Sequence, residues 1–154
     1  MAKRRISKGR TPGRCQKTMK NEAMLTRISN WLKRLEIEYE VISEKNMIKT
    51  TSNPPLLIFI EENIVRNTLI ICGIEKIPEK KRAFFYQRLL ELSGKRNLLK
   101  ASLHKDTLTF DTDILPENLD FDIFRESIFA NYTAFSEISK DVLDFYRNNL
   151  KDRH

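Results

Sequence analysis

The sequence predicts an α+β domain in which an antiparallel sheet packs against helices, in the order α-β-β-β-α-β-β-α. The first observation is a series of short, β-prone apolar runs between residues 39 and 74, separated by polar or proline-containing breaks. The second is a pair of apolar runs, 98–103 and 107–110, joined by a polar triplet as in a hairpin. The third is an apolar residue at every third or fourth position from Phe121 to Phe145, which indicates one long amphipathic helix.

A first helix is expected over residues 22–37, with Asn21 as its N-cap. Its apolar residues recur at helical spacing and form one stripe: Met24, Ile28, Trp31, Leu32 and Leu35. Because Trp31 lies on this stripe, we interpret the only tryptophan as a core anchor rather than a binding hot spot.

The central strands are apolar without interruption. Residues 39–42 form a short run, and residues 47–50 either continue it or pair with it. After the break at Pro54 and Pro55, the runs 56–60 and 68–74 match each other as strands. Continuous apolar strands indicate burial on both faces, so helices are expected on one face and another cover, such as a partner, on the other.

A second helix is expected over residues 79–92, with Pro78 at its start and Gly94 as its C-cap. Phe85, Leu89 and Leu92 form its apolar stripe, and three further apolar residues lie off that stripe: Phe84, Tyr86 and Leu90. Either this helix meets a second subunit as well as the sheet, or a wide stripe is simply well buried.

The lead-in to the last helix is rich in carboxylates. Asp111 and Asp113 alternate along an extended segment, and carboxylates at this density can bind a divalent cation. Turn formation and helix capping explain them better, with Asp120 or Asn118 as the cap of the last helix.

The net charge of +7 is concentrated in one segment. Residues 1–20 carry +8 without an acidic side chain, and the remaining residues carry −1. We expect residues 1–20 to form a disordered basic tail, followed by a single domain over 21–150. The tail is either a solvated extension or a contact for nucleic acid or an anionic membrane. The side chains expected to make that contact are Lys3, Arg4, Arg5, Lys8, Arg10 and Arg14.

No motif of catalysis or cofactor binding stands out. The four glycines form no phosphate-binding loop pattern. The two histidines, His104 at a predicted turn and His154 at the last position, are poorly placed for a catalytic triad. Cys15 lies in the polar N-terminal tail and Cys72 in an apolar strand. This separation argues against a disulfide or a zinc site, and it fits a reducing compartment. With neither a signal peptide nor a transmembrane run in the sequence, we expect a cytoplasmic, non-enzymatic protein without cofactor.

Three segments resemble the bacterial type III secretion chaperone fold, meaning the Tir chaperone (CesT) family and the related YbjN-like proteins. They are Phe84–Leu92 as the second helix, Asn97–Phe110 as the closing hairpin, and Ile114–Asp120 leading into the long helix. The resemblance covers roughly residues 22–148. It implies a dimer that holds an extended, partly unfolded segment of a partner protein against apolar grooves, without chemistry.

Two functions follow as hypotheses. The first is a dimeric, chaperone-like module that binds a client protein, with Phe84, Tyr86, Leu90 and Leu98 at the dimer or client surface. The second is a nucleic-acid- or ribosome-associated protein that makes its contact through the basic tail.

Overall fold

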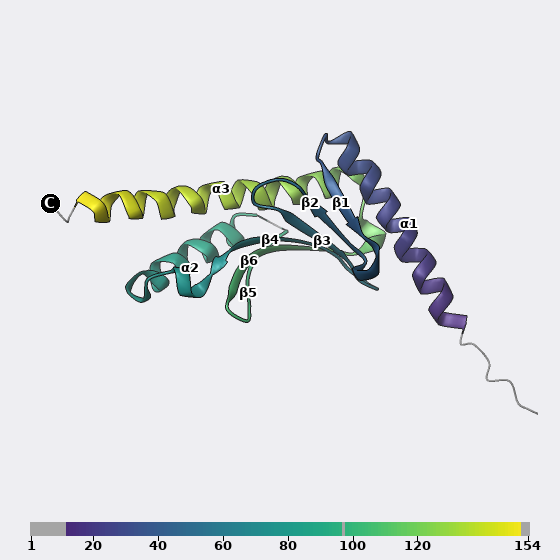
Figure 1. Cartoon of the computed structure of the whole chain (residues 1–154), viewed down its shortest axis with the longest axis horizontal. Helices are drawn as coiled ribbons and strands as arrows, with labels where there is room; N and C mark the ends of the chain where they lie inside the picture. The colour runs from purple at the N-terminus through teal and green to yellow at the C-terminus, as the bar shows by residue number, and fades with distance from the viewer. Residues whose placement is uncertain (1–11, 97, 152–154) are drawn as a thin grey trace, which may run out of the picture.

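The computed structural model describes the backbone of residues 12–96 and 98–151, and the side chains of residues 20–96 and 98–141 (Figure 1). The regular elements follow the chain as α1 (Pro12–Arg34), β1 (Tyr39–Ile42), β2 (Met47–Thr50), β3 (Leu56–Ile60), β4 (Val65–Gly73), α2 (Glu79–Gly94), β5 (Leu99–His104), β6 (Thr107–Ile114) and α3 (Phe121–Lys151).

The strands form one six-stranded antiparallel sheet in the order β1-β2-β3-β4-β6-β5. The predicted α+β class is confirmed, with one strand more before α2 than expected. The segments 39–42 and 47–50 pair with each other, Tyr39 opposite Thr50. The turn between them ends at Asn46, whose φ of 47° is a left-handed conformation that asparagine adopts more readily than most residues.

Helix α1 begins at Pro12, well before the predicted start at residue 22. Residues 12–20 therefore belong to this helix and not to the disordered tail that we predicted, whereas residues 1–11 lie outside the described part. Proline suits the first helical position, and the arginine, lysine, glutamine and methionine that follow have good helix propensity. Once the packed turns beyond residue 24 form the helix nucleus, each added residue gains a hydrogen bond.

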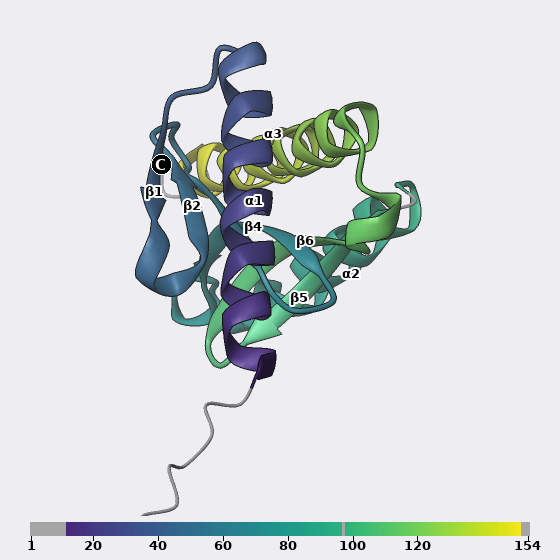
Figure 2. The ribbon, with the colours of Figure 1, turned by 90° about the vertical axis from the view of Figure 1, so that its right-hand side faces the viewer.

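All three helices cover the same face of the sheet. In β3 the residues Leu56, Ile58 and Ile60 are buried against the helices, while Leu57 and Phe59 point the other way and are half-buried. Figure 2 looks onto α1, with β1 and β2 at its left, α2 at its right and α3 passing behind it. No helix of the described residues lies on the opposite side of the sheet, and we call that side the helix-free face.

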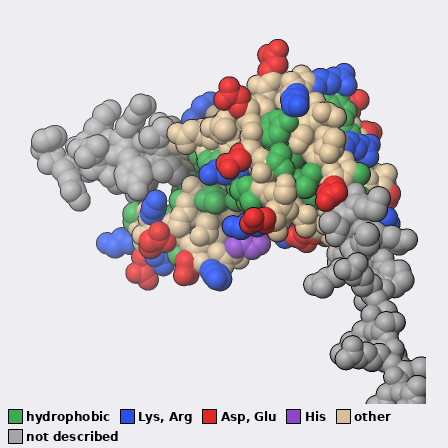
Figure 3. Space-filling model, turned by 45° about the vertical axis from the view of Figure 1, so that its right-hand side comes forward, with side chains coloured by type: hydrophobic (Ala, Val, Ile, Leu, Met, Phe, Trp, Pro, Cys, Tyr) green, Lys and Arg blue, Asp and Glu red, His purple; other side chains and the backbone are tan. Residues whose placement is uncertain are grey.

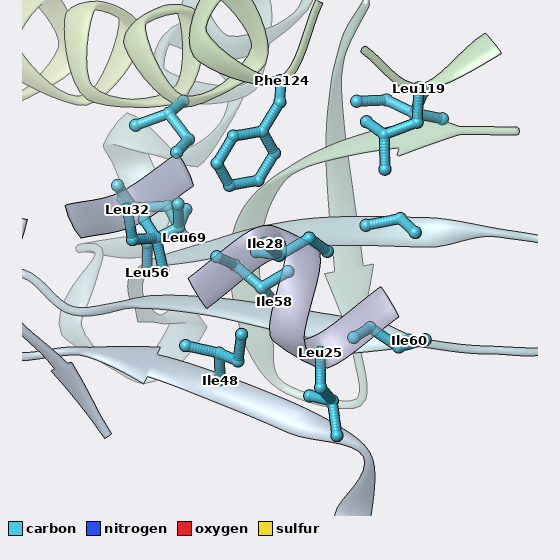
Figure 4. Packing of buried hydrophobic residues seen from close by; sticks show 13 residues of the cluster. Leu25, Ile28, Leu32, Ile48, Leu56, Ile58, Ile60, Leu69, Leu119 and Phe124 are labelled. Atoms are coloured by element: carbon cyan, nitrogen blue, oxygen red, sulfur yellow. The ribbon is translucent and has the colours of Figure 1, made fainter. Parts of the chain in front are cut away.

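Two apolar clusters form the core. The first lies between α1, the central strands and the first half of α3, and its largest buried side chain is Phe124 (Figure 4). The second joins α2, β5, β6 and the middle of α3, around Phe110. As predicted, the α2 stripe Phe85, Leu89 and Leu92 is buried.

A buried polar layer separates the two clusters along α3. Asn67 of β4 and Thr112 of β6 are paired across the sheet, and Ser127 and Asn131 of α3 lie over them. Asn67 donates to Ser127 Oγ at 2.6 Å, and Asn131 donates to Thr112 Oγ1 at 3.3 Å. All four side chains are fully buried, so a slip of α3 along the sheet leaves polar groups without partners, and the layer fixes the register of α3.

Helix α3 has the predicted stripe. Phe124, Ile128 and Ile138 are buried, and Tyr132 and Phe135 are half-buried against the first cluster. The side chains of residues 142–146 on the same stripe lie outside the described part. The predicted cap is also present, because the backbone N–H of Ile123 donates to the Asp120 carboxylate at 2.8 Å.

Candidate partner-binding surfaces

The helix-free face has an apolar half over β1 to β3. Met47 lies opposite Ile42 on one side and Phe59 on the other, so the three form a row across these strands. Leu57 lies on the next row, and Ile70 of β4 is 40% exposed. Figure 3 shows a band of hydrophobic side chains across this side of the molecule, bordered by acidic and basic ones. Met47 is buried, Ile42, Leu57 and Phe59 are half-buried, and Ile70 is exposed, so water reaches this apolar strip chiefly at Ile70, and none of the described helices covers it.

The other half of this face, over β4 to β6, carries an ion-pair ladder. Arg66 Nε donates to the Asp113 carboxylate at 2.7 Å, and Lys100 Nζ donates to its second oxygen at 2.7 Å. Burial acts to raise the pKa of Asp113, but the hydrogen bonds from the two cations outweigh it and lower that pKa below its ordinary value. The same hydrogen bond raises the pKa of Arg66.

Asp111 is buried on this face and fully engaged. Its carboxylate accepts from Thr68 Oγ1 at 2.7 Å and Thr109 Oγ1 at 3.1 Å, and lies 3.0 Å from His104 Nε2. We attributed Asp111 and Asp113 to turn formation and capping, and that interpretation is wrong because both lie inside β6. Their role is to tie neighbouring strands together. Within the part of the chain that the structure describes, no three histidine, cysteine, aspartate or glutamate side chains come together as a metal site.

The α2 residues predicted for a dimer or client surface differ in exposure. Phe84 is 54% exposed and Leu90 is 70% exposed, whereas Tyr86 is half-buried against the second cluster. Six residues separate Phe84 from Leu90, which places them about 120° apart around the helix axis. Tyr86 and Leu90, four residues apart, share one side. The helix therefore presents two small apolar surfaces on either side of its buried stripe.

Strand β5 forms one edge of the sheet beside α2. Leu98, also predicted for this surface, is half-buried in the turn before the strand. Leu103 near the end of β5 is 53% exposed, although its neighbour across the ladder, Leu108, is buried. An unpaired edge with an exposed apolar residue is a position at which another strand can add.

A hollow of about 380 Å³ lies between α1 and the β3–β4 turn. Its lining mixes apolar side chains with charges of both signs and contains neither histidine nor cysteine: Lys20, Asn21, Ala23, Met24, Arg27, Ile60, Glu61, Glu62, Asn63, Val65, Pro116 and Glu117. These groups form no nucleophile–base pair.

The residues predicted to contact nucleic acid or membrane lie mostly outside the described part: Lys3, Arg4, Arg5, Lys8 and Arg10. Arg14 lies in α1, and its side chain is outside the described set. Among the helices that the structure describes, none is long and apolar enough to cross a membrane.

No protein-family model and no curated protein matches this sequence. Two solved structures share its fold. YbjN from E. coli, suggested to be a transcription regulator, aligns over 74% of this chain and 86% of its own, with a TM-score of 0.56 and 10% identity. The ExsC-ExsE complex aligns over 75% of this chain and 90% of its own, with the same TM-score and identity. The chain therefore has the YbjN-like, type III secretion chaperone-like fold that its sequence resembles.

Proposed function

We propose that this protein is a non-catalytic, dimeric binding module that holds an extended segment of a partner protein. The observation that carries the proposal is the one-sided sheet. The three described helices cover one face, and the other keeps a partly exposed apolar strip, in which Ile70 is 40% accessible to water and Met47 is buried. Apolar side chains on a sheet face that no described helix covers are typical of a binding surface.

The geometry of the helix-free face suits an extended segment. Alternate side chains of an extended chain point to one side, so they can meet the row formed by Ile42, Met47 and Phe59. The adjoining ladder of Arg66, Asp113 and Lys100 offers charges of both signs, which can select the orientation and the charge pattern of the segment. The solved ExsC-ExsE complex supports the proposal because a protein of this fold is found there with a partner.

The test compares two glutamate variants of the full chain. Ile70→Glu places a charge on the apolar strip, whereas Phe129→Glu places one on the outer side of α3, where Phe129 is 55% exposed. Both proteins are applied to an array of overlapping peptides, and bound partners from a cell extract are identified by mass spectrometry. We expect apolar, extended peptides to bind, and Ile70→Glu to weaken that binding at least tenfold, because the charge must be desolvated.

Phe129→Glu should bind as the unaltered chain does. Equal binding by Ile70→Glu, or equal weakening by the two variants, contradicts a client site on the helix-free face. Circular dichroism and thermal unfolding of both variants show whether each retains its fold.

A second candidate function is contact with nucleic acid through the basic N-terminus. The charge distribution favours it, because five basic side chains and no acidic one precede Pro12. YbjN, suggested to be a transcription regulator, shares the fold.

A further inference from the structure

Three arginines gather around two aromatic rings where α1 meets the start of α3. The Arg27 guanidinium lies over the Trp31 ring, 4.6 Å from its centroid. Arg34 lies over Phe121 at 3.9 Å, and Arg125 lies 5.8 Å from the same ring. The two rings meet edge to face, with 6.3 Å between their centroids. We call these five residues the arginine–aromatic cluster.

Two of the three cations have no carboxylate partner among the side chains that the structure describes. Arg125 forms an ion pair with Asp122 at 3.1 Å. Arg27 donates one N–H to the carbonyl of Leu119 at 2.9 Å, and neither Arg27 nor Arg34 has an ion pair with a carboxylate among the described residues. Both arginines are exposed, and both rings are half-buried. The cluster therefore has charge and hydrogen-bond donors left for a ligand.

The cluster also lies on the most basic part of the chain. Residues 1–34 hold eleven basic side chains and one acidic one, a net charge of +10, whereas the rest of the chain carries −3. Helix α1 leads directly from the basic N-terminus to the cluster. A polyanion that is attracted to the N-terminus can thus follow α1 to Arg27 and Arg34.

We propose that the arginine–aromatic cluster binds single-stranded nucleic acid. A guanidinium that lies over a ring keeps N–H groups with which it can donate hydrogen bonds to a phosphate, although Arg27 already uses one of them on Leu119. Unstacked bases pack on exposed arginine planes and aromatic rings regardless of their sequence. This site goes beyond partner-protein binding, and it lies on α1 and α3, away from the strip on β1 to β4.

The test measures binding of labelled oligo(dT) and oligo(U), each about 15 nucleotides long, to the full chain by fluorescence anisotropy at several salt concentrations. Arg27→Gln with Arg34→Gln removes two charges from the cluster. Lys49→Gln with Lys140→Gln removes two charges from exposed positions elsewhere and serves as the matched control. We expect the cluster variant to bind at least tenfold more weakly and the control to stay within about threefold. The slope of log K against log salt should fall by about 1.4, the value for two phosphate contacts on a single strand.

Trp31 reports on the site directly, because it is the only tryptophan. Binding at the cluster should change its fluorescence along the same curve as the anisotropy. The charge-conserving pair Arg27→Lys and Arg34→Lys should lose part of the affinity, since lysine lacks the planar fork.

Several outcomes overturn the proposal. One is equal weakening by the cluster variant and its control, and another is oligonucleotide binding without a change in Trp31 emission. A third is binding of anionic phospholipid vesicles or polyglutamate but of neither oligonucleotide. Ile70→Glu should leave oligonucleotide binding intact, so this proposal and the client site fail independently. If the Gln variant does not fold, the Lys pair and the Trp31 signal still decide.

Discussion

At the scale of single residues, the ladder on the helix-free face makes a pH-dependent contribution to stability. The folded protein lowers the pKa of Asp113 below its ordinary value of about 3.9. A carboxylate with a depressed pKa stabilises the fold fully above its unfolded pKa, and this stabilisation is lost as the pH falls through the folded value. The contribution of Asp113 is therefore present at neutral pH and disappears in strong acid.

We predict that Asp113→Asn lowers the free energy of unfolding by on the order of 1–2 kcal/mol at pH 7, because Arg66 and Lys100 lose a charged acceptor at a partly buried position. The difference from the unaltered chain should shrink below about pH 4. Urea unfolding at pH 7, 5 and 3 measures it. Glu40→Gln, an exposed carboxylate on β1, is the control and should have little effect at any of these pH values. A difference for Asp113→Asn that does not vary with pH contradicts this electrostatic account.

The carboxylates of β6 also show what residue-level reasoning missed. Leu108, Phe110, Thr112 and Ile114 face the helices, and the residues that alternate with them face the other way: Thr109, Asp111 and Asp113. This alternation with a period of two is visible in the sequence and is typical of a half-exposed strand. We ended the strand at Phe110 and read the residues after it as a lead-in to the last helix. Aspartate is rare in strands, but here cross-strand partners compensate for that preference.

At the scale of elements, the packing of α3 on the sheet should dominate stability. We predict that Phe124→Ala costs about 3–5 kcal/mol, because the side chain is fully buried in the first cluster. Phe135→Ala should cost roughly half as much, since that side chain is only partly buried. Chemical denaturation measures both values. A loss under ~1 kcal/mol for Phe124→Ala is incompatible with the packing described here.

Local patterns predicted the type of most elements and failed where tertiary contacts decide. The apolar stripes of α2 and α3 were sufficient to predict these two helices, because each helix buries one face. The start of α1 was missed, since residues 12–20 carry no apolar stripe and their helix extends from the packed turns that follow. The arginine–aromatic cluster had only a partial local signal, the Arg27–Trp31 and Phe121–Arg125 pairs at helical spacing. Trp31 and Phe121 lie far apart in the sequence and meet only when α1 packs against α3.

At the scale of the whole molecule, charge is divided between a basic N-terminal segment, residues 1–34, and a weakly acidic remainder. We predict that replacing Lys3, Arg4, Arg5, Lys8 and Arg10 by glutamine in the full chain weakens nucleic-acid binding and lowers its salt slope by up to about 3.5. Anisotropy titrations with the oligonucleotides described above measure both quantities. If affinity and slope stay unchanged, the second candidate function is wrong, and any binding belongs to the cluster on α1 and α3.

The quaternary structure is the remaining whole-molecule prediction. The apolar positions on α2 that remain exposed, together with the free edge of β5, leave apolar surface beside the second cluster. A symmetric pair of chains can bury this surface, and most soluble homo-oligomers are such pairs. We therefore expect light scattering at micromolar concentration to give about twice the chain mass of 18.2 kDa.

Glutamate substitutions on α2 test which surface makes the dimer. Leu90→Glu and Phe84→Glu each introduce a charge at a position that is more than half exposed in the single chain, so each variant should still fold. The variant at the true interface should dissociate into monomers, because a charge buried against the partner is not desolvated cheaply. Phe129→Glu on the outer side of α3 is the matched control and should remain dimeric. Phe84 and Leu90 lie on different sides of α2. If only one of the two substitutions disrupts the dimer, the result therefore also shows which side of α2 faces the partner chain. A mass near 18.2 kDa for the unaltered chain excludes the dimer.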